Sequence, residues 1–231
     1  MYFGDATYIL VLIGAALSLA ASGYLKSTFS KYSRVRCSSG LTGAEAAARI
    51  LKNSGIDYVK IERIAGNLTD HYDPRKKVLR LSESVYDSSS IAAVGVAAHE
   101  CGHAIQDSTQ YAPLKMRSLL VPVATIGSQL GMPLVFIGFI LGLELPIGLL
   151  LLNIGIIAFG IAVLFQIVTL PVEFNASSRA LNTLGDYGIM GSEEVRDGSK
   201  VLTAAALTYV AAAAAAVLQL LRLIMLRNRR S

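Results

Sequence analysis

Long apolar stretches constrain the fold of this 231-residue chain more than any other feature. Residues 119–143 and 145–170 contain no charged side chain, and only Glu144 separates them. Because about 20 apolar residues in a helix cross the hydrocarbon core of a bilayer, each run is long enough to span a membrane. Pro146 interrupts the sequence next to the short connection, so the two runs predict a transmembrane hairpin over residues 119–170.

Further apolar segments lie near both ends of the chain. Residues 8–24 lack charge, and no basic region of the kind that opens a signal peptide precedes them, so they predict an N-terminal anchor over residues 1–25. Residues 201–226 are rich in alanine, which is only marginally favourable for membrane insertion. This last segment is either a further span or a helix that packs on the rest of the protein at the interface. Three to four transmembrane helices are therefore predicted.

Basic residues predict the orientation. Four of them follow the first apolar run closely: Lys26, Lys31, Arg34 and Arg36. Because basic residues favour the cytoplasmic side, the N-terminus is expected outside and the segment that begins at residue 26 is expected in the cytoplasm. A fourth span would place the arginines at the C-terminal end outside, against the same bias.

The composition fits a membrane protein with one modest water-facing domain. Hydrophobic residues make up 53% of the chain and charged residues only 16%. The net charge of +5 comes from basic residues beside apolar runs, so the expected partner is a lipid bilayer and no nucleic acid. With only Cys37 and Cys101 present, a structural disulfide is not expected, which favours a reducing compartment.

One short motif carries chemistry: His-Glu-x-x-His at residues 99–103. On a helix, His99 and His103 lie one turn apart on the same face, so both imidazoles can bind one zinc ion. Glu100 lies about 100° round from His99, where a carboxylate can take a proton from a zinc-activated water. Cys101 points to the opposite side and is not expected to be a ligand.

The water-facing part, residues 38–118, carries the signals of two helices and two strands. These elements are expected over residues 42–55, 58–64, 78–82 and 91–107. Thr42 and Glu45 form a capping box at the start of the first helix, and serines before residue 91 are N-cap candidates for the helix that carries the motif. Residues 68–75 contain an Asp-Pro turn signal and are predicted as a loop. The small sheet either offers an edge to an extended peptide or merely covers the motif helix.

The zinc site still lacks a ligand, because a catalytic zinc usually has three protein ligands and an open fourth position. Glu173 follows Pro171 at a plausible helix start directly after the hairpin. An antiparallel hairpin returns the chain to the side from which it left, which nominates Glu173 over Glu144 at the opposite end. The alternative is a glutamate that only lies at the membrane interface.

Several motifs resemble those of the neutral zinc metallopeptidases of bacterial membranes. They are Gly-Leu-Thr-Gly-Ala at residues 40–44, Leu-Thr-Asp-His-Tyr-Asp-Pro at 68–74, Ala-Ala-His-Glu at 97–100 and Gly-His-Ala-Ile-Gln at 102–106. The His-Glu-x-x-His motif, the hairpin and Glu173-Phe174-x-Ala176 also look like the gluzincin membrane proteases, the group of CaaX prenyl proteases and bacterial heat-shock membrane proteases. The resemblance covers nearly the whole chain.

The resemblance implies a mainly α-helical fold with a membrane-embedded zincin-like domain, a small β-sheet and one zinc ion per chain. It also implies an endopeptidase of the bacterial cell membrane, with Glu173 as third ligand and a peptide or membrane protein as substrate. The wider gluzincin group places an aspartate one turn after the ligand glutamate, where it supports a ligand histidine. Ser177 stands there in this chain, so support must come from Ser177, Asn175 or another group.

The expected reaction is metal-assisted hydrolysis of a peptide bond, with Glu100 as general base. A donor for the developing oxyanion is also needed. The candidates are His71, Arg179 and Tyr187. For His71, hydrogen bonds to its own neighbours are the alternative role.

The chain is therefore expected to contain five segments. They are the anchor (1–25), the catalytic domain with the motif helix (26–118), the hairpin (119–170), a third-ligand helix with a polar loop (171–200) and the alanine-rich helix (201–231).

Two other classes of protein remain open at this point. An intramembrane protease of the site-2 type would take its third ligand from an aspartate, for which Asp186 is the candidate. A non-catalytic membrane adaptor would keep zinc only for structure, but a structural site has no use for Glu100 and usually has four protein ligands.

Overall fold

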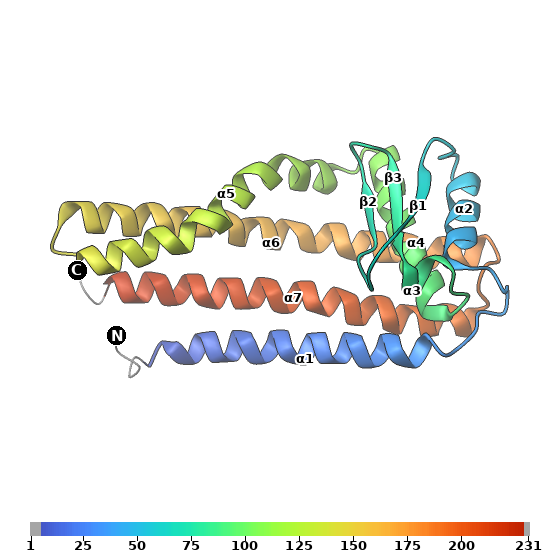
Figure 1. The fold of residues 1–231 in the computed structure, drawn as a ribbon, viewed down its shortest axis with the longest axis horizontal. Coiled ribbons are helices and arrows are strands. Elements are labelled where there is room, and N and C mark those ends of the chain that lie inside the picture. The colour runs from blue at the N-terminus through green and yellow to red at the C-terminus, as the bar shows by residue number, and fades with distance from the viewer. Residues whose placement is uncertain (1–5, 229–231) are drawn as a thin grey trace. The chain divides into compact units, whose positions relative to one another are not determined.

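The computed structural model describes residues 6–228, so the outer ends of the predicted segments 1–25 and 201–231 lie outside the described residues. The fold is mainly helical with one small sheet, as predicted (Figure 1). In chain order the elements are α1 (Tyr8–Tyr32), α2 (Gly43–Asn53), β1 (Lys60–Ile64), β2 (His71–Asp73), β3 (Val78–Ser82), α3 (Glu83–Tyr86), α4 (Ile91–Ser108), α5 (Ala112–Leu141), α6 (Pro146–Asp186) and α7 (Ser192–Asn228).

Within the described residues, four helices are long and apolar enough to cross a membrane: α1, α5, α6 and α7. The predicted hairpin corresponds to α5 and α6, which are joined by a short link at residues 142–145. The alanine-rich segment forms part of α7, whose 37 residues exceed the length that a span requires.

The chain divides into two compact units, and several of the long helices contribute residues to both. The first unit consists of Met1–Ala21, Lys115–Leu170 and Thr208–Ser231. The second consists of Ser22–Leu114 and Pro171–Leu207.

In the first unit, helices pack closely through small residues. A Cβ atom at Gly127 of α5 would lie 2.4 Å from the carbonyl oxygen of Ala158 in α6, and one at Gly14 of α1 would lie 3.0 Å from Ala215 of α7. Contacts of this kind are typical of helices that associate in a bilayer, where apolar burial alone gives no driving force. Large apolar side chains such as Leu119, which is 78% exposed, lie on the outer faces, as expected for surfaces in contact with lipid.

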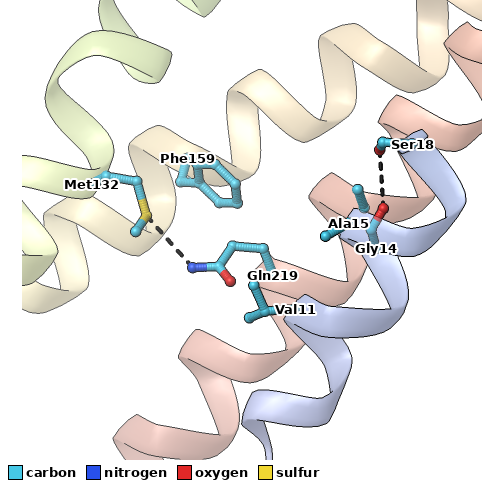
Figure 2. Close-up of a pocket in the computed structure, with 8 residues that line it drawn as sticks. Val11, Gly14, Ala15, Ser18, Met132, Phe159 and Gln219 are labelled. Atoms are coloured by element: carbon cyan, nitrogen blue, oxygen red, sulfur yellow. Dashed lines mark hydrogen bonds between the residues drawn. The ribbon is translucent and has the colours of Figure 1, made fainter. Parts of the chain in front are cut away.

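A pocket of about 380 Å³ lies within the first unit (Figure 2). Its lining residues come from all four long helices: Val11, Gly14, Ala15, Ser18, Met132, Phe159, Ala215 and Gln219. The polar side chains are Ser18, whose hydroxyl donates to the Gly14 carbonyl oxygen, and Gln219, whose amide lies 3.8 Å from the Met132 sulfur. The lining is otherwise apolar and suits a hydrocarbon environment.

In the second unit, the three strands form one sheet in the order β1-β3-β2 (Figure 1). β1 runs parallel to β3 with Lys60 opposite Val78, and β2 runs antiparallel to β3 with His71 opposite Arg80. The predicted strand 78–82 is confirmed, and the first strand begins two residues later than predicted. β3 occupies the centre and is buried, whereas β2 is an edge strand.

The prediction of a loop over residues 68–75 was wrong at its centre, because β2 lies there. Three residues are too few to show the alternating pattern that predicts a strand from sequence. The strand is instead stabilised by a contact with a residue far away in the chain. Tyr72 packs against the core, and its hydroxyl donates to an Asp107 carboxylate oxygen 2.7 Å away. That bond fixes β2 beside α4.

The helices of the second unit begin and end largely as predicted. Thr42 and Glu45 form the predicted capping box, and Gly55 has a positive φ of 69° just after α2. The Ser90 hydroxyl accepts from the backbone N–H of Ala93 and caps α4. α2 and α4 pack together around buried alanines, and the Cys101 sulfur faces the carbonyl of Ala47 on α2, away from the metal motif.

The helix start predicted at Pro171 is wrong, because α6 continues through this residue to Asp186. Proline removes one backbone hydrogen bond, a loss that long apolar helices tolerate when packing holds the next turn in place. Val172 and Ala176, on either side of Glu173, are both fully buried. The predicted segment 171–200 therefore consists of the end of α6, a short connection at residues 187–191 and the start of α7.

Candidate metal centre

The two motif histidines lie in the middle of α4, on the face that turns toward α6. Their rings are nearly perpendicular, at 85°, with centroids 4.8 Å apart. His103 is 9% exposed and His99 is partly buried. This arrangement follows from the i, i+4 spacing on a helix, which stacks both side chains on one face.

Glu173 of α6 meets both histidines. Its Oε2 atom lies 3.3 Å from His99 Nε2 and 3.5 Å from His103 Nε2. The Glu173 residue is only 2% exposed, and all three ligand atoms lie within 4.8 Å of one another. The structure thus brings together the three residues that the sequence nominated as metal ligands.

These separations fit a zinc ion. Zinc binds imidazole nitrogen and carboxylate oxygen at about 2.0–2.1 Å in tetrahedral geometry, which places neighbouring ligand atoms about 3.3 Å apart. The two observed N···O separations match that spacing. Two imidazoles and one carboxylate are also a donor set that leaves a fourth position open, as in catalytic zinc sites.

The far side of each histidine ring has a hydrogen-bond partner. His99 Nδ1 lies 3.1 Å from the Ser177 hydroxyl, and His103 Nδ1 lies 3.0 Å from Gln106 Oε1. Such partners orient metal-binding histidines and direct the other ring nitrogen toward the metal. Ser177 thus occupies the supporting position that the sequence left open.

Burial and nearby carboxylates act on His103 and Cys101 in different ways. Burial tends to lower the pKa of His103, but its hydrogen bond with Glu173 and the negative charge of Glu100 outweigh that effect, so the pKa is raised. Burial raises the pKa of the Cys101 thiol well above its ordinary value, and Glu100 adds to the shift. A thiol that resists deprotonation is a poor zinc ligand, in agreement with the orientation of Cys101.

Glu100 lies next to His99 and is 8% exposed. Within the described residues, its carboxylate makes no hydrogen bond or ion pair. Its oxygen atoms are not among the fully buried polar atoms that lack a partner, so they keep access to solvent beside His99.

The three oxyanion candidates have partners outside the metal cluster. His71 Nδ1 bonds to the Thr69 carbonyl and its Nε2 lies 3.3 Å from an Arg80 nitrogen. The Tyr187 hydroxyl lies 3.2 Å from the Ser54 hydroxyl. Arg179 donates from Nε to Asn175 Oδ1 over 2.8 Å.

Sequence reasoning gave no role to Gln106. The signal was available in part, because Gln106 follows His103 by three residues and so lies on the same helix face. Its partners on α6 lie 66 and 69 residues away in the chain, and no local pattern shows them.

Two histidines from one helix and a glutamate from another form a buried cluster that could hold a metal ion, in a chain with four helices long and apolar enough to cross a membrane. The family described as "Putative neutral zinc metallopeptidase" matches residues 7–228, and the chain belongs to this family. The protein named "Putative membrane protease YugP" from Bacillus subtilis (strain 168) is 48% identical over 218 residues, which is 94% of each chain. No solved structure matches this chain significantly.

Proposed function

We propose that this chain is a zinc-dependent membrane endopeptidase that holds one zinc ion and hydrolyses peptide bonds. The observation that carries the proposal is the convergence of His99 Nε2, His103 Nε2 and Glu173 Oε2 at the spacing of zinc ligands. Family membership and the name of the Bacillus relative support a membrane-associated zinc peptidase of some kind.

In this proposal, bound zinc supplies a Lewis acid that acidifies a water molecule and polarises the scissile carbonyl. Glu100 accepts the proton of the attacking water and then delivers it to the leaving amine. Two observations support that role: Glu100 adjoins the ligand His99, and its carboxylate has no partner among the described residues. A carboxylate already bound to a lysine or arginine would be a weaker base.

The sheet supports a peptide substrate. β2 is an edge strand fixed beside α4, and among the described residues no strand pairs with its outer edge. An extended peptide can add to such an edge through main-chain hydrogen bonds, which accept many side chains. A peptide or a membrane-protein segment bound there would run beside the helix that carries His99 and His103.

We also propose a location in the bacterial cell membrane with the catalytic residues in the cytoplasm. The four long apolar helices and the relative's name support a membrane protein. The basic residues in the last turns of α1 and just after it support the orientation, because they follow the apolar part of the first span.

The rival assignments have less support. Asp186, the candidate ligand of an intramembrane protease, is exposed and ends α6, thirteen residues beyond Glu173. That separation is about 20 Å along a helix, too far for both to bind one ion. An adaptor with structural zinc would not need an unpartnered carboxylate at Glu100.

The test is zinc content and peptide cleavage of the purified protein beside Glu100→Gln. The amide keeps the shape of Glu100 but does not accept a proton at neutral pH, so the variant should retain zinc and lose cleavage by about 100-fold or more. Glu193→Gln is the matched control, because Glu193 is exposed on α7 and pairs with Arg196 three residues on. Unchanged cleavage in Glu100→Gln would exclude the assigned base, and a wild-type protein without zinc would exclude the whole proposal.

A further inference from the structure

Gln106 connects the metal cluster on α4 to α6 through its side-chain amide. It is fully buried, and each of its polar atoms has a partner. Oε1 lies 3.0 Å from His103 Nδ1, and Nε2 donates to the Val172 carbonyl oxygen at 2.8 Å and to Asn175 Oδ1 at 3.0 Å. The two Nε2 partners flank Glu173 on α6, one residue before it and two after it.

The partners determine which way the Gln106 amide faces. The carbonyl oxygen of Val172 can only accept, so the NH₂ group of Gln106 must face it and Oε1 must face His103. Oε1 can only accept in turn, so its contact with His103 requires a proton on Nδ1. His103 Nε2 faces Glu173, so a metal held between them would take the lone pair of Nε2 while the proton stays on Nδ1.

A second donor fixes Asn175 in this network. Asn175 Oδ1 also accepts from Arg179 Nε, and the Arg179 guanidinium lies 5.7 Å from the centre of the Tyr111 ring. With two donors directed at Oδ1, the Asn175 oxygen stays turned toward Gln106. The amide of Gln106 therefore has no alternative orientation that satisfies all of its neighbours.

We propose that Gln106 is a positioning residue of the metal site, which holds His103 in the Nδ1–H tautomer and ties it to the helix that carries Glu173. The inference rests on the proposed zinc site. A side chain that fixes a ligand histidine typically contributes 10–100-fold to metal affinity. Gln106 differs from the usual carboxylate support in being neutral, so it orients His103 without adding charge.

The experiment measures zinc dissociation constants by competition with a chelator for the wild type, Gln106→Met and Gln106→Glu. Gln106→Met keeps the length but gives His103 no strong acceptor, so zinc binding should weaken by about 10–100-fold. Gln106→Glu keeps an oxygen for His103 but removes the donors to Val172 and Asn175, so it should bind zinc more tightly than Gln106→Met. Gln110→Met is the matched control, because Gln110 is exposed just after α4, and its affinity should not change.

The two glutamine variants separate positioning from packing. A purely structural Gln106 would make Gln106→Glu at least as harmful as Gln106→Met, because Glu loses both bonds to α6 and adds a buried charge. Zinc binding by Gln106→Glu that is as weak as or weaker than binding by Gln106→Met would overturn the inference. A Gln106→Met dissociation constant within about threefold of the wild-type value would overturn it as well. Failure of the wild type itself to bind zinc would instead overturn the proposed function.

A measurement on the wild type avoids dependence on how well the variants fold. ¹⁵N NMR of the zinc-loaded protein shows which ring nitrogen of a histidine carries the proton and which one binds the metal. His103 should carry its proton on Nδ1. A proton on Nε2 would show that Gln106 does not set the tautomer.

Discussion

Gly102 of α4 lies directly against the backbone of Ala176 in α6, so that a Cβ atom at Gly102 would come within 2.4 Å of the Ala176 carbonyl oxygen. Gly102 precedes His103, and Ala176 follows Glu173 by three residues. The two helices thus touch through backbone atoms beside their ligands. This contact sets the separation between the histidine pair and the carboxylate, because no side chain stands between the helices at that point.

Gly102→Ala should therefore weaken zinc binding. The added methyl group must push α6 away from α4, which lengthens the 3.3 Å and 3.5 Å separations between the histidines and Glu173. We expect a loss of zinc affinity of about 10-fold or more, with a destabilisation of about 1–3 kcal/mol from overpacking. Zinc titration and thermal unfolding measure the two effects.

Gly95→Ala is the matched control for that variant. Gly95 is a buried glycine of the same helix, but a Cβ atom there would meet nothing within 4 Å. Alanine should be neutral or stabilise the helix by up to about 1 kcal/mol, without any change in zinc affinity. Equal affinities in both variants would show that the Gly102 contact does not set the ligand spacing.

Glu173→Ala should lose zinc as well as activity, because it removes the carboxylate ligand and leaves two histidines alone. Asp186→Ala should change neither property by much, since Asp186 is exposed at the end of α6. Zinc occupancy of the purified variants, measured by elemental analysis, shows whether Glu173 or Asp186 is the third ligand. Full zinc in Glu173→Ala with depleted zinc in Asp186→Ala would favour the intramembrane class of protease.

Ser177→Ala should weaken zinc binding by about 10-fold, because His99 Nδ1 loses the hydroxyl that orients its ring. Ser178→Ala provides the control at the next position, where the serine is exposed. The two variants are compared by chelator competition. A loss of equal size in both would assign the effect to the helix and not to the hydrogen bond.

The features that the sequence predicted are those determined by local spacing. The i, i+4 interval of His99 and His103, the capping box at Thr42 and the strand 78–82 all depend on residues within one element. Glu173 was nominated by chain topology, since a hairpin must return. None of these features depends on which surfaces of the protein pack together.

The features that escaped prediction depend on partners far away in the chain. β2 is held by the bond from Tyr72 to Asp107, 35 residues on, and Gln106 bonds to residues more than 60 positions away. Pro171 is a third case. A proline can remain inside a helix when packing holds the following turn, and here Val172 and Ala176 of that turn are buried. Tertiary contacts override local preference at all three positions.

The orientation in the membrane can be tested with single introduced cysteines. Both native cysteines are buried, Cys37 at 2% and Cys101 at 0% exposure, so an exposed new thiol should react without removing them. Asp57 is exposed after α2, and Glu144 lies in the link between α5 and α6. The two positions sample the predicted cytoplasmic domain and the predicted outer end of the hairpin.

With the N-terminus outside, α1 leads into the cytoplasm and α5 leads back out, so the two thiols should lie on opposite sides. Glu144→Cys should react with a membrane-impermeant maleimide on intact spheroplasts, whereas Asp57→Cys should react only after lysis. The parent protein, with its buried cysteines, measures the background. The opposite result would be labelling of Asp57→Cys on intact spheroplasts, with Glu144→Cys protected until lysis. It would show that the catalytic residues face outward and that the basic residues at and after the end of α1 do not determine the topology.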